Sequence, residues 1–97
     1  MQRWNLVKNG IQLGSLSHKR SDQPFHYYHF EPTAAFAEIA PLFATELRSL
    51  NGNDAEQWVR DYDRIDRLHL ALVSPDGSAQ LDDFVLHVAG SEAWFRA

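Results

Sequence analysis

The side chains with the widest chemical range gather in residues 23–30, which carry four aromatic rings and two imidazoles. Imidazoles serve as general acids or bases and as metal ligands. Residues 25–30 predict a strand, because Pro24 cannot donate to a ladder and suits a strand start. Successive strand side chains point to opposite faces, so His26 and His29 cannot chelate one ion. The stretch therefore predicts neither a metal site nor a cofactor site.

Three further histidines lie elsewhere: His18 in a predicted loop, and His69 and His87 in predicted strands. An imidazole beside a carboxylate in a cleft forms an acid–base pair, and Asp82 or Asp83 could supply the carboxylate. The chain has no nucleophile motif and no glycine-rich phosphate loop, so catalysis is the less favoured hypothesis. The alternative is a small enzyme or ligand-binding protein whose pocket contains His26, His29, His69 or His87.

Aromatic and acidic side chains supply the candidate partner-binding surfaces. Tyrosine is enriched among the residues that dominate binding energy. Aspartates lie among basic residues in a predicted second helix, a pattern typical of a solvated face stabilised by i,i+4 ion pairs. The same face could instead meet a basic protein surface. The residues predicted to contact a protein partner are His26, Tyr27, Tyr28, His29, Asp61, Asp63 and Asp66.

Length and charge limit the class of protein. At 97 residues the chain predicts one domain with a single core. Its net charge is −4 and Lys19-Arg20 is its one adjacent basic pair, which disfavours binding to duplex nucleic acid. The lack of cysteine fits a reducing compartment. No window is apolar enough for a secretory signal or a membrane span, which predicts a cytoplasmic protein without a membrane partner.

Residues 3–17 predict a β-hairpin around Asn9-Gly10, a dipeptide that suits the two positive φ angles of a type I′ turn. The register of this turn pairs Lys8 with Ile11, Leu6 with Leu13 and Trp4 with Ser15. The apolar residues Trp4, Leu6, Ile11 and Leu13 then share the face that is predicted to contact the core. The polar residues 18–23 that follow predict a loop.

Two helices follow the third predicted strand. Residues 34–50 carry apolar side chains at helical spacing, interrupted by Pro41. Either one helix kinks at Pro41, or residues 34–39 form a short helical turn and the main helix begins at Pro41. Asn51-Gly52 predicts its end. The second helix begins after a cap at Asn53 or Asp54 and runs to about residue 67.

The last third of the chain predicts three strands. Residues 68–73 are almost continuously apolar, which predicts a central strand. A type I turn at residues 74–77 leads to a return strand over residues 80–88, and residues 92–96 form the last strand. The order βββααβββ with tight turns predicts an α+β fold: an antiparallel sheet of about six strands with two helices packed on one face.

Turn and core motifs recur along the chain: Trp4-x-Leu6, Asn9-Gly10, Leu13-Gly14-x-Leu16, Asp22-x-Pro24-Phe25, Phe30-x-Pro32, Phe84-x-Leu86-His87-Val88 and Ala93-Trp94-Phe95-Arg96. In this pattern the chain resembles a group of small uncharacterised bacterial α+β proteins. The motifs are structural and the resemblance implies no activity, so no residue takes a role from it.

The functional prediction is a non-catalytic protein-binding module, for instance a small inhibitor or immunity-type protein that acts on a larger bacterial or phage target. Its small size, acidic balance and aromatic-rich strand support this hypothesis. A homodimer joined through an edge strand, or a structural homo-oligomer, is a second alternative. An exposed aromatic patch rimmed by acids favours the protein-binding module, whereas imidazoles converging on one concave site favour the ligand-binding alternative.

Overall fold

Seven strands and two α-helices make up residues 3–96, the part of the chain that the computed structural model describes. The elements are β1 (Arg3–Lys8), β2 (Ile11–Asp22), β3 (Phe25–Pro32), the 3-10 helix η1 (Ala34–Glu38), α1 (Ala40–Asn51), α2 (Ala55–Asp66), β4 (Ala71–Val73), β5 (Gln80–Leu81), β6 (Val85–Ala89) and β7 (Glu92–Arg96). The α+β prediction is confirmed, with seven strands rather than about six. Met1 and Gln2, which open the stretch searched for a secretory signal, and Ala97 lie outside the described residues.

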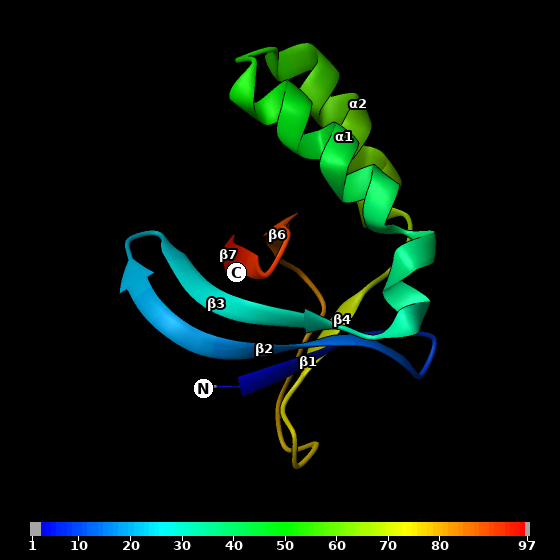
Figure 1. Cartoon of the computed structure of the whole chain (residues 1–97), viewed down its shortest axis with the longest axis vertical. Coiled ribbons are helices and arrows are strands. Elements are labelled where there is room, and N and C mark those ends of the chain that lie inside the picture. Colours follow the sequence, from blue (N-terminus) through cyan, green and yellow to red (C-terminus); the bar gives the residue numbers. More distant parts are fainter. Residues whose placement is uncertain (1–2, 97) are drawn as a thin grey trace.

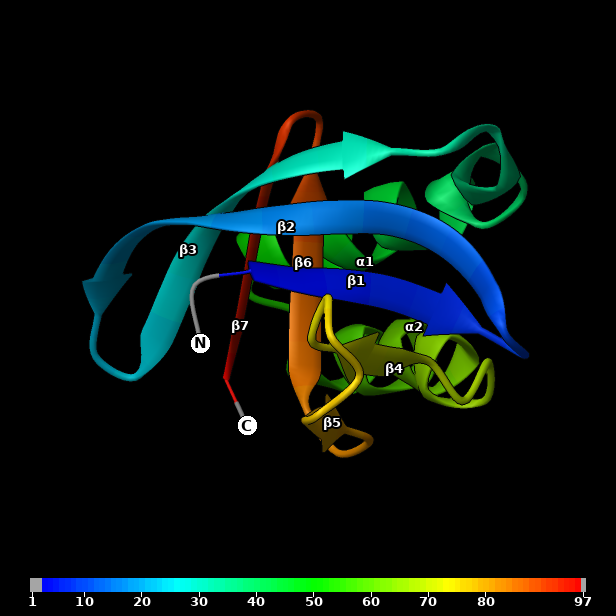
Figure 2. The same cartoon turned by 90° about the horizontal axis from the view of Figure 1, so that it is seen from below.

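The strands form one antiparallel sheet in the order β5-β4-β1-β2-β3-β7-β6. The sheet curls, so that β6 and β7 run across behind β1 and β2 (Figure 2). Helices α1 and α2 lie side by side at the β6 end of the sheet, where α1 packs against β6 (Figure 1). The curl leaves an inner face, which is enclosed between the front and back strands, and an outer face.

Two predictions for the last third of the chain are wrong. Residues 80–88 form two strands that lie at opposite edges of the sheet, where β5 pairs with β4 and β6 pairs with β7. The exposed Asp82 and Asp83 separate them, because adjacent carboxylates favour solvent over a ladder inside a core. The predicted central strand over residues 68–73 shortens to β4, which lies next to the edge strand.

The register of the first hairpin shifts by one residue halfway along. Lys8 pairs with Ile11 as predicted, but Leu6 pairs with Gly14 rather than with Leu13. A β-bulge at this point inserts an extra residue into β2 and so exchanges the two faces of that strand. Trp4 therefore pairs with Leu16, and Ile11, predicted to face the core, is 59% exposed.

Strand β2 extends far beyond its predicted end. Residues 18–22, predicted as part of a polar loop, continue the ladder with β3, and a second irregularity lies between His18 and Arg20. Polar residues suit this part of the strand because it lies at the rim of the sheet, where most of them are exposed. The extension places His18 opposite Tyr28 and Ser21 opposite His26.

The helices follow the second of the two predicted arrangements. Helix η1 is a short, separate turn, and α1 begins at Ala40 with Pro41 in its first turn, where a missing N–H costs no hydrogen bond. Gly52 ends α1 as predicted. Asp54, rather than Asn53, caps α2, because its Oδ1 accepts a hydrogen bond from the Gln57 backbone N–H at 3.1 Å.

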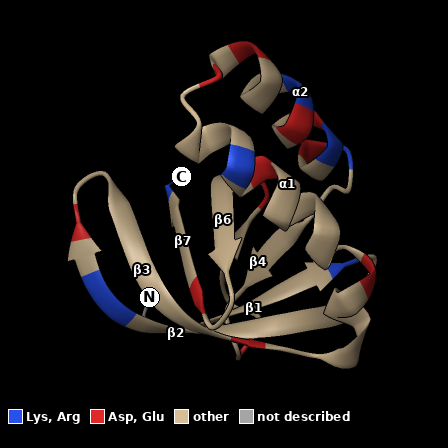
Figure 3. Cartoon of the chain, turned by 45° about the horizontal axis from the view of Figure 1, so that its top comes forward, with Lys and Arg blue, Asp and Glu red and all other residues tan. Residues whose placement is uncertain are grey.

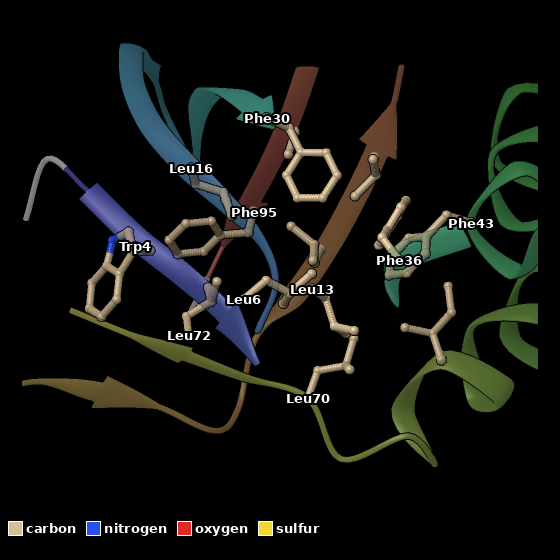
Figure 4. Packing of buried hydrophobic residues seen from close by; sticks show 14 of the residues in the cluster. Trp4, Leu6, Leu13, Leu16, Phe30, Phe36, Phe43, Leu70, Leu72 and Phe95 are labelled. Carbon is tan, nitrogen blue, oxygen red and sulfur yellow. The ribbon is translucent and has the colours of Figure 1, made fainter. Parts of the chain in front are cut away.

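A continuous apolar cluster fills the inner face of the curled sheet. Figure 4 shows Leu16, Phe30 and Phe95 pointing into this space from different strands. Phe36 and Phe43 close one end of the cluster from η1 and α1, while Trp4 lies toward the other end. The helical segment therefore closes one end of the curled sheet.

Tyr62 of α2 occupies the free edge of β6. Its hydroxyl accepts a hydrogen bond from the Leu86 backbone N–H at 2.7 Å and donates to the Phe84 carbonyl at 3.4 Å. One side chain therefore satisfies a backbone donor and a backbone acceptor that an edge strand would otherwise present to another chain.

We expect Tyr62→Phe to lower the free energy of unfolding by about 1–2 kcal/mol at neutral pH, because the buried Leu86 N–H loses its acceptor. Burial raises the pKa of Tyr62 from 10.0 to about 12. The folded protein thus holds the phenolic proton more tightly than the unfolded chain does, so this stabilisation is complete below pH 10 and is lost as the pH rises toward 12. Urea unfolding at neutral and alkaline pH measures both effects.

The matched control for this prediction is Tyr27→Phe, because Tyr27 is half-buried on the outer face of β3. It should leave the stability nearly unchanged. The stability gap between wild type and Tyr62→Phe should narrow in alkaline solution. The two ends of the pH range, about 8 and about 11, lie on either side of the ordinary tyrosine pKa. A stability gap that stays constant across this range contradicts the stabilising role assigned to the Tyr62 hydroxyl.

Candidate functional site

An open cavity of about 690 Å³ lies at the end of the curled sheet that the helices leave open. Its floor consists of three aromatic side chains, Trp4, Tyr28 and Phe95, which we call the aromatic floor. One side is formed by three polar residues of the β2–β3 hairpin, His18, Ser21 and His26, which we call the imidazole wall. Gln23, Pro24, Leu81 and Arg96 complete the lining.

The imidazole wall is a hydrogen-bonded chain of three side chains. Ser21 Oγ lies 3.0 Å from His18 Nε2 and 2.9 Å from His26 Nδ1. The two ring centroids are 6.5 Å apart. The hydroxyl has one proton, so it donates to one imidazole and accepts an N–H from the other. The wall thus holds two imidazoles at one hydroxyl, and their remaining ring nitrogens make no hydrogen bond with any of the described residues.

The geometry of the wall favours binding over nucleophilic catalysis. A serine nucleophile needs a base that a third group, usually a carboxylate, holds in one tautomer. Among the described residues, no carboxylate makes a hydrogen bond with His18 or His26. Ser21 itself is exposed at the rim. The same three groups are well placed to hydrogen-bond a ligand that enters the cavity.

The aromatic floor is flat and well packed. Tyr28 and Phe95 stack with centroids 5.3 Å apart and ring planes 14° apart. Tyr28 is 3% exposed, and burial raises the pKa of its hydroxyl, an effect that a hydrogen bond with Trp4 partly offsets. The floor therefore stays uncharged, and most of its ring surface lies in the core.

The two faces of β3 carry different sets of predicted contact residues. His26 and Tyr28 belong to the cavity, whereas Tyr27 and His29 lie on the outer face, as the parity of the strand predicts. Tyr27 stacks on Trp94 with centroids 6.0 Å apart, and the Arg20 guanidinium lies 4.3 Å from the Tyr27 ring centroid. We call Arg20, Tyr27 and Trp94 the outer aromatic patch. His29 is exposed.

The three predicted aspartates of α2 are not equivalent. Asp61 is only 4% exposed and accepts a hydrogen bond from Gln57 Nε2 at 2.9 Å. Asp63 forms the predicted i,i+4 ion pair with Arg67 at 2.8 Å, and Asp66 is exposed. Figure 3 shows acidic and basic residues interspersed along α2. The face presents mixed charge rather than an acidic surface.

The remaining histidines lie away from the cavity. His69 lines a separate small cavity of about 100 Å³ near the end of α2. His87 of β6 is buried, and its Nδ1 lies 2.9 Å from Glu46 Oε2 of α1. The same carboxylate oxygen accepts a hydrogen bond from Trp58 Nε1 of α2 at 2.6 Å. Of the imidazoles predicted to form one pocket, only His26 lies in the cavity, where His18 joins it.

Sequence reasoning missed His18 and Ser21 because it assigned both to a loop. No signal in the sequence marks this extension of β2, because residues 18–22 are all polar and show no apolar alternation. Sequence reasoning also missed Glu46, an acid that follows the buried Phe43 by three positions on the apolar face of α1. An acid at such a position signals a buried partner.

Comparisons with models of protein families, with curated proteins and with solved structures found no match for this chain. The resemblance to small bacterial proteins thus stays a prediction. Within residues 3–96, no three histidine or acidic side chains gather in a way that could hold a metal ion. No helix in the same range is long and apolar enough to cross a membrane.

Proposed function

We propose that the protein is a non-catalytic binding protein that holds a small ligand in the cavity at the open end of its curled sheet. The observation that carries the proposal is the imidazole wall standing over the aromatic floor. A few convergent polar groups against apolar surface are the usual composition of a small-molecule site, and such sites recur at the mouths of curled sheets. The volume of about 690 Å³ suits a small organic molecule.

The rigidity of the walls supports this function. The floor belongs to the main core, in which Trp4, Tyr28 and Phe95 are each at most 6% exposed. The wall stands on two paired strands, so its side chains keep their spacing without a ligand. A site that is formed before the ligand arrives loses little entropy on binding.

The proposal is tested by titrating the protein with a set of small neutral, cationic and anionic aromatic compounds while backbone amide resonances are recorded. We expect at least one compound to shift the resonances of Ser21, His26 and Phe95 together. The variant Ser21→Tyr, which places a ring in the cavity mouth, should abolish those shifts. The control Ser17→Tyr changes the same strand at a position paired with the outer-face His29 and should keep them.

If no compound in the set perturbs the cavity residues, or if Ser21→Tyr binds as the wild type does, the cavity is not the binding site. This conclusion does not depend on the charge of the true ligand, because the set contains neutral, cationic and anionic compounds.

A second candidate is the protein-binding module predicted from the sequence, including its inhibitor or immunity form. The outer aromatic patch favours it, since stacked tyrosine and tryptophan beside an arginine are the residue types enriched at binding hot spots. It predicts that a purified partner protein is retained by the wild type and lost with Tyr27→Ala. Retention by Tyr27→Ala together with loss in Ser21→Tyr assigns partner binding to the cavity instead.

A further inference from the structure

We infer that the ligand of the cavity is an organic anion with a planar ring, in which a carboxylate or phosphate group meets the imidazole wall and the ring lies on the aromatic floor. This inference rests on the proposed function and names the chemical class that the site selects.

The charge of the lining is opposite in sign to the charge of the whole chain. The protein carries 13 acidic and 9 basic side chains and a net charge of −4. Yet among the described residues, none that line the cavity is an aspartate or a glutamate. Among the described lining residues, Arg96 is the one with a permanent charge. A cavity that excludes acids within an acidic protein disfavours cations and favours anions.

The polar groups of the lining are mainly hydrogen-bond donors when an anion is present. Ser21 donates its proton to one imidazole of the wall, and that ring then carries its own N–H on the nitrogen that faces away from Ser21. Gln23 also lines the cavity, and its side-chain amide is a further hydrogen-bond donor. Hydrogen bonds from a charged donor to a carboxylate or phosphate are about twice as strong as neutral ones. The wall therefore suits an acceptor oxygen of an anionic ligand.

The aromatic floor favours a ligand that contains a ring. Tyr28, Phe95 and Trp4 contribute apolar ring atoms to the lining, and each of these side chains is at most 6% exposed. Aromatic rings gain beyond simple burial when they stack offset or edge-on. A compact inorganic anion would reach the wall but leave the floor in contact with water.

A metal ion fits the same wall poorly. Only His18 and His26 could supply strong ligands, and a hydroxyl between them is a weak third donor. Zinc sites use three or four imidazole, thiolate or carboxylate ligands. The absence of acids from the described lining, which favours an anion, argues against a cation for the same reason.

The experiment compares four probes: benzoate and its neutral isostere benzamide, phenyl phosphate, and inorganic phosphate, which lacks the ring. Dissociation constants come from the shifts of cavity amide resonances in the wild type. We expect benzoate or phenyl phosphate to bind at least about tenfold more tightly than benzamide. Whichever of the two binds more tightly identifies the anionic group. This comparison needs no variant, so it does not depend on the folding of one.

Two variants then test whether the imidazoles of the wall cause the preference for an anion. The double variant His18→Gln, His26→Asn keeps side-chain amides within reach of Ser21 but removes both imidazoles, so the preference for the anion should fall to near unity. The matched control His29→Asn changes an exposed histidine on the opposite face of β3 and should leave the preference intact.

Three outcomes overturn the inference. Equal binding of benzamide and the two aromatic anions in the cavity removes the preference for an anion but leaves the cavity as a binding site. Inorganic phosphate binding as tightly as phenyl phosphate removes the role of the aromatic floor. Failure of every probe here, together with success of a neutral or cationic compound in the wider set, separates a wrong ligand class from a wrong site.

Discussion

Replacement of His87 by leucine is expected to lower the free energy of unfolding by about 3–5 kcal/mol, because it leaves a buried carboxylate without its main partner. Glu46 is 0% exposed and His87 is 3% exposed. His87 Nδ1 lies 3.0 Å from one carboxylate oxygen and 2.9 Å from the other. After the substitution only the Trp58 indole N–H would contact the Glu46 carboxylate.

This loss is large relative to the net stability of the domain. A domain of this size has a net stability of about 5–15 kcal/mol, so His87→Leu would bring the fold close to its unfolding threshold. The affected contact also joins α1, α2 and β6, and the hydrogen bond between Tyr62 and the Leu86 backbone is a further polar link between α2 and β6. We therefore expect the helical pair to lose protection against hydrogen exchange before β1 and β2 do.

A double-mutant cycle measures the effect by urea unfolding. Glu46→Leu combined with His87→Leu should recover much of the loss, because two apolar side chains of suitable volume can replace a buried hydrogen-bonded pair at little cost. The exposed Glu56→Leu in α2 is the control for general effects of removing an acid from a helix. A single variant His87→Leu that unfolds at the wild-type urea concentration contradicts the role assigned to the pair.

Replacement of Gly14 by alanine is the second large expected effect, a loss of about 2–3 kcal/mol from overpacking. An added Cβ would lie 2.5 Å from Cε1 and 2.6 Å from Cζ of Phe30, and 3.0 Å from the Glu31 carbonyl oxygen. Phe30 is 2% exposed and packs edge-on against Phe36, with ring centroids 4.9 Å apart. The ring therefore has little room to move.

The test is whether a smaller side chain at position 30 relieves the clash. Phe30→Leu destabilises the wild type by leaving a cavity, but it should destabilise Gly14→Ala much less, so the two losses should not add. Ser15→Ala, at the neighbouring half-buried position, serves as the control and should have little effect. Strict additivity of Gly14→Ala and Phe30→Leu contradicts a direct contact between the two sites.

The sequence by itself determined the features that depend on local chemistry. The Asn9-Gly10 turn, the end of α1 at Gly52 and the α+β class all follow from short-range patterns, and a helix start near Pro41 was one of two arrangements that the sequence allowed. The parity of β3 also follows, because alternation along a strand needs no knowledge of its neighbours. That parity correctly separated His26 from His29 and assigned Tyr28 to the same face as His26.

Only the tertiary structure decided which residues form the cavity and the buried pair. The bulges after Leu6 and near Lys19 exchange the faces of β2, and nothing in the residue pattern marks where they occur. They bring His18 and Ser21 to His26. The curl of the sheet places β7 beside β3, so Phe95 reaches the floor. Glu46 meets His87 across 41 positions of the chain. Such contacts depend on strand order and register, which are properties of long-range packing rather than of local propensity.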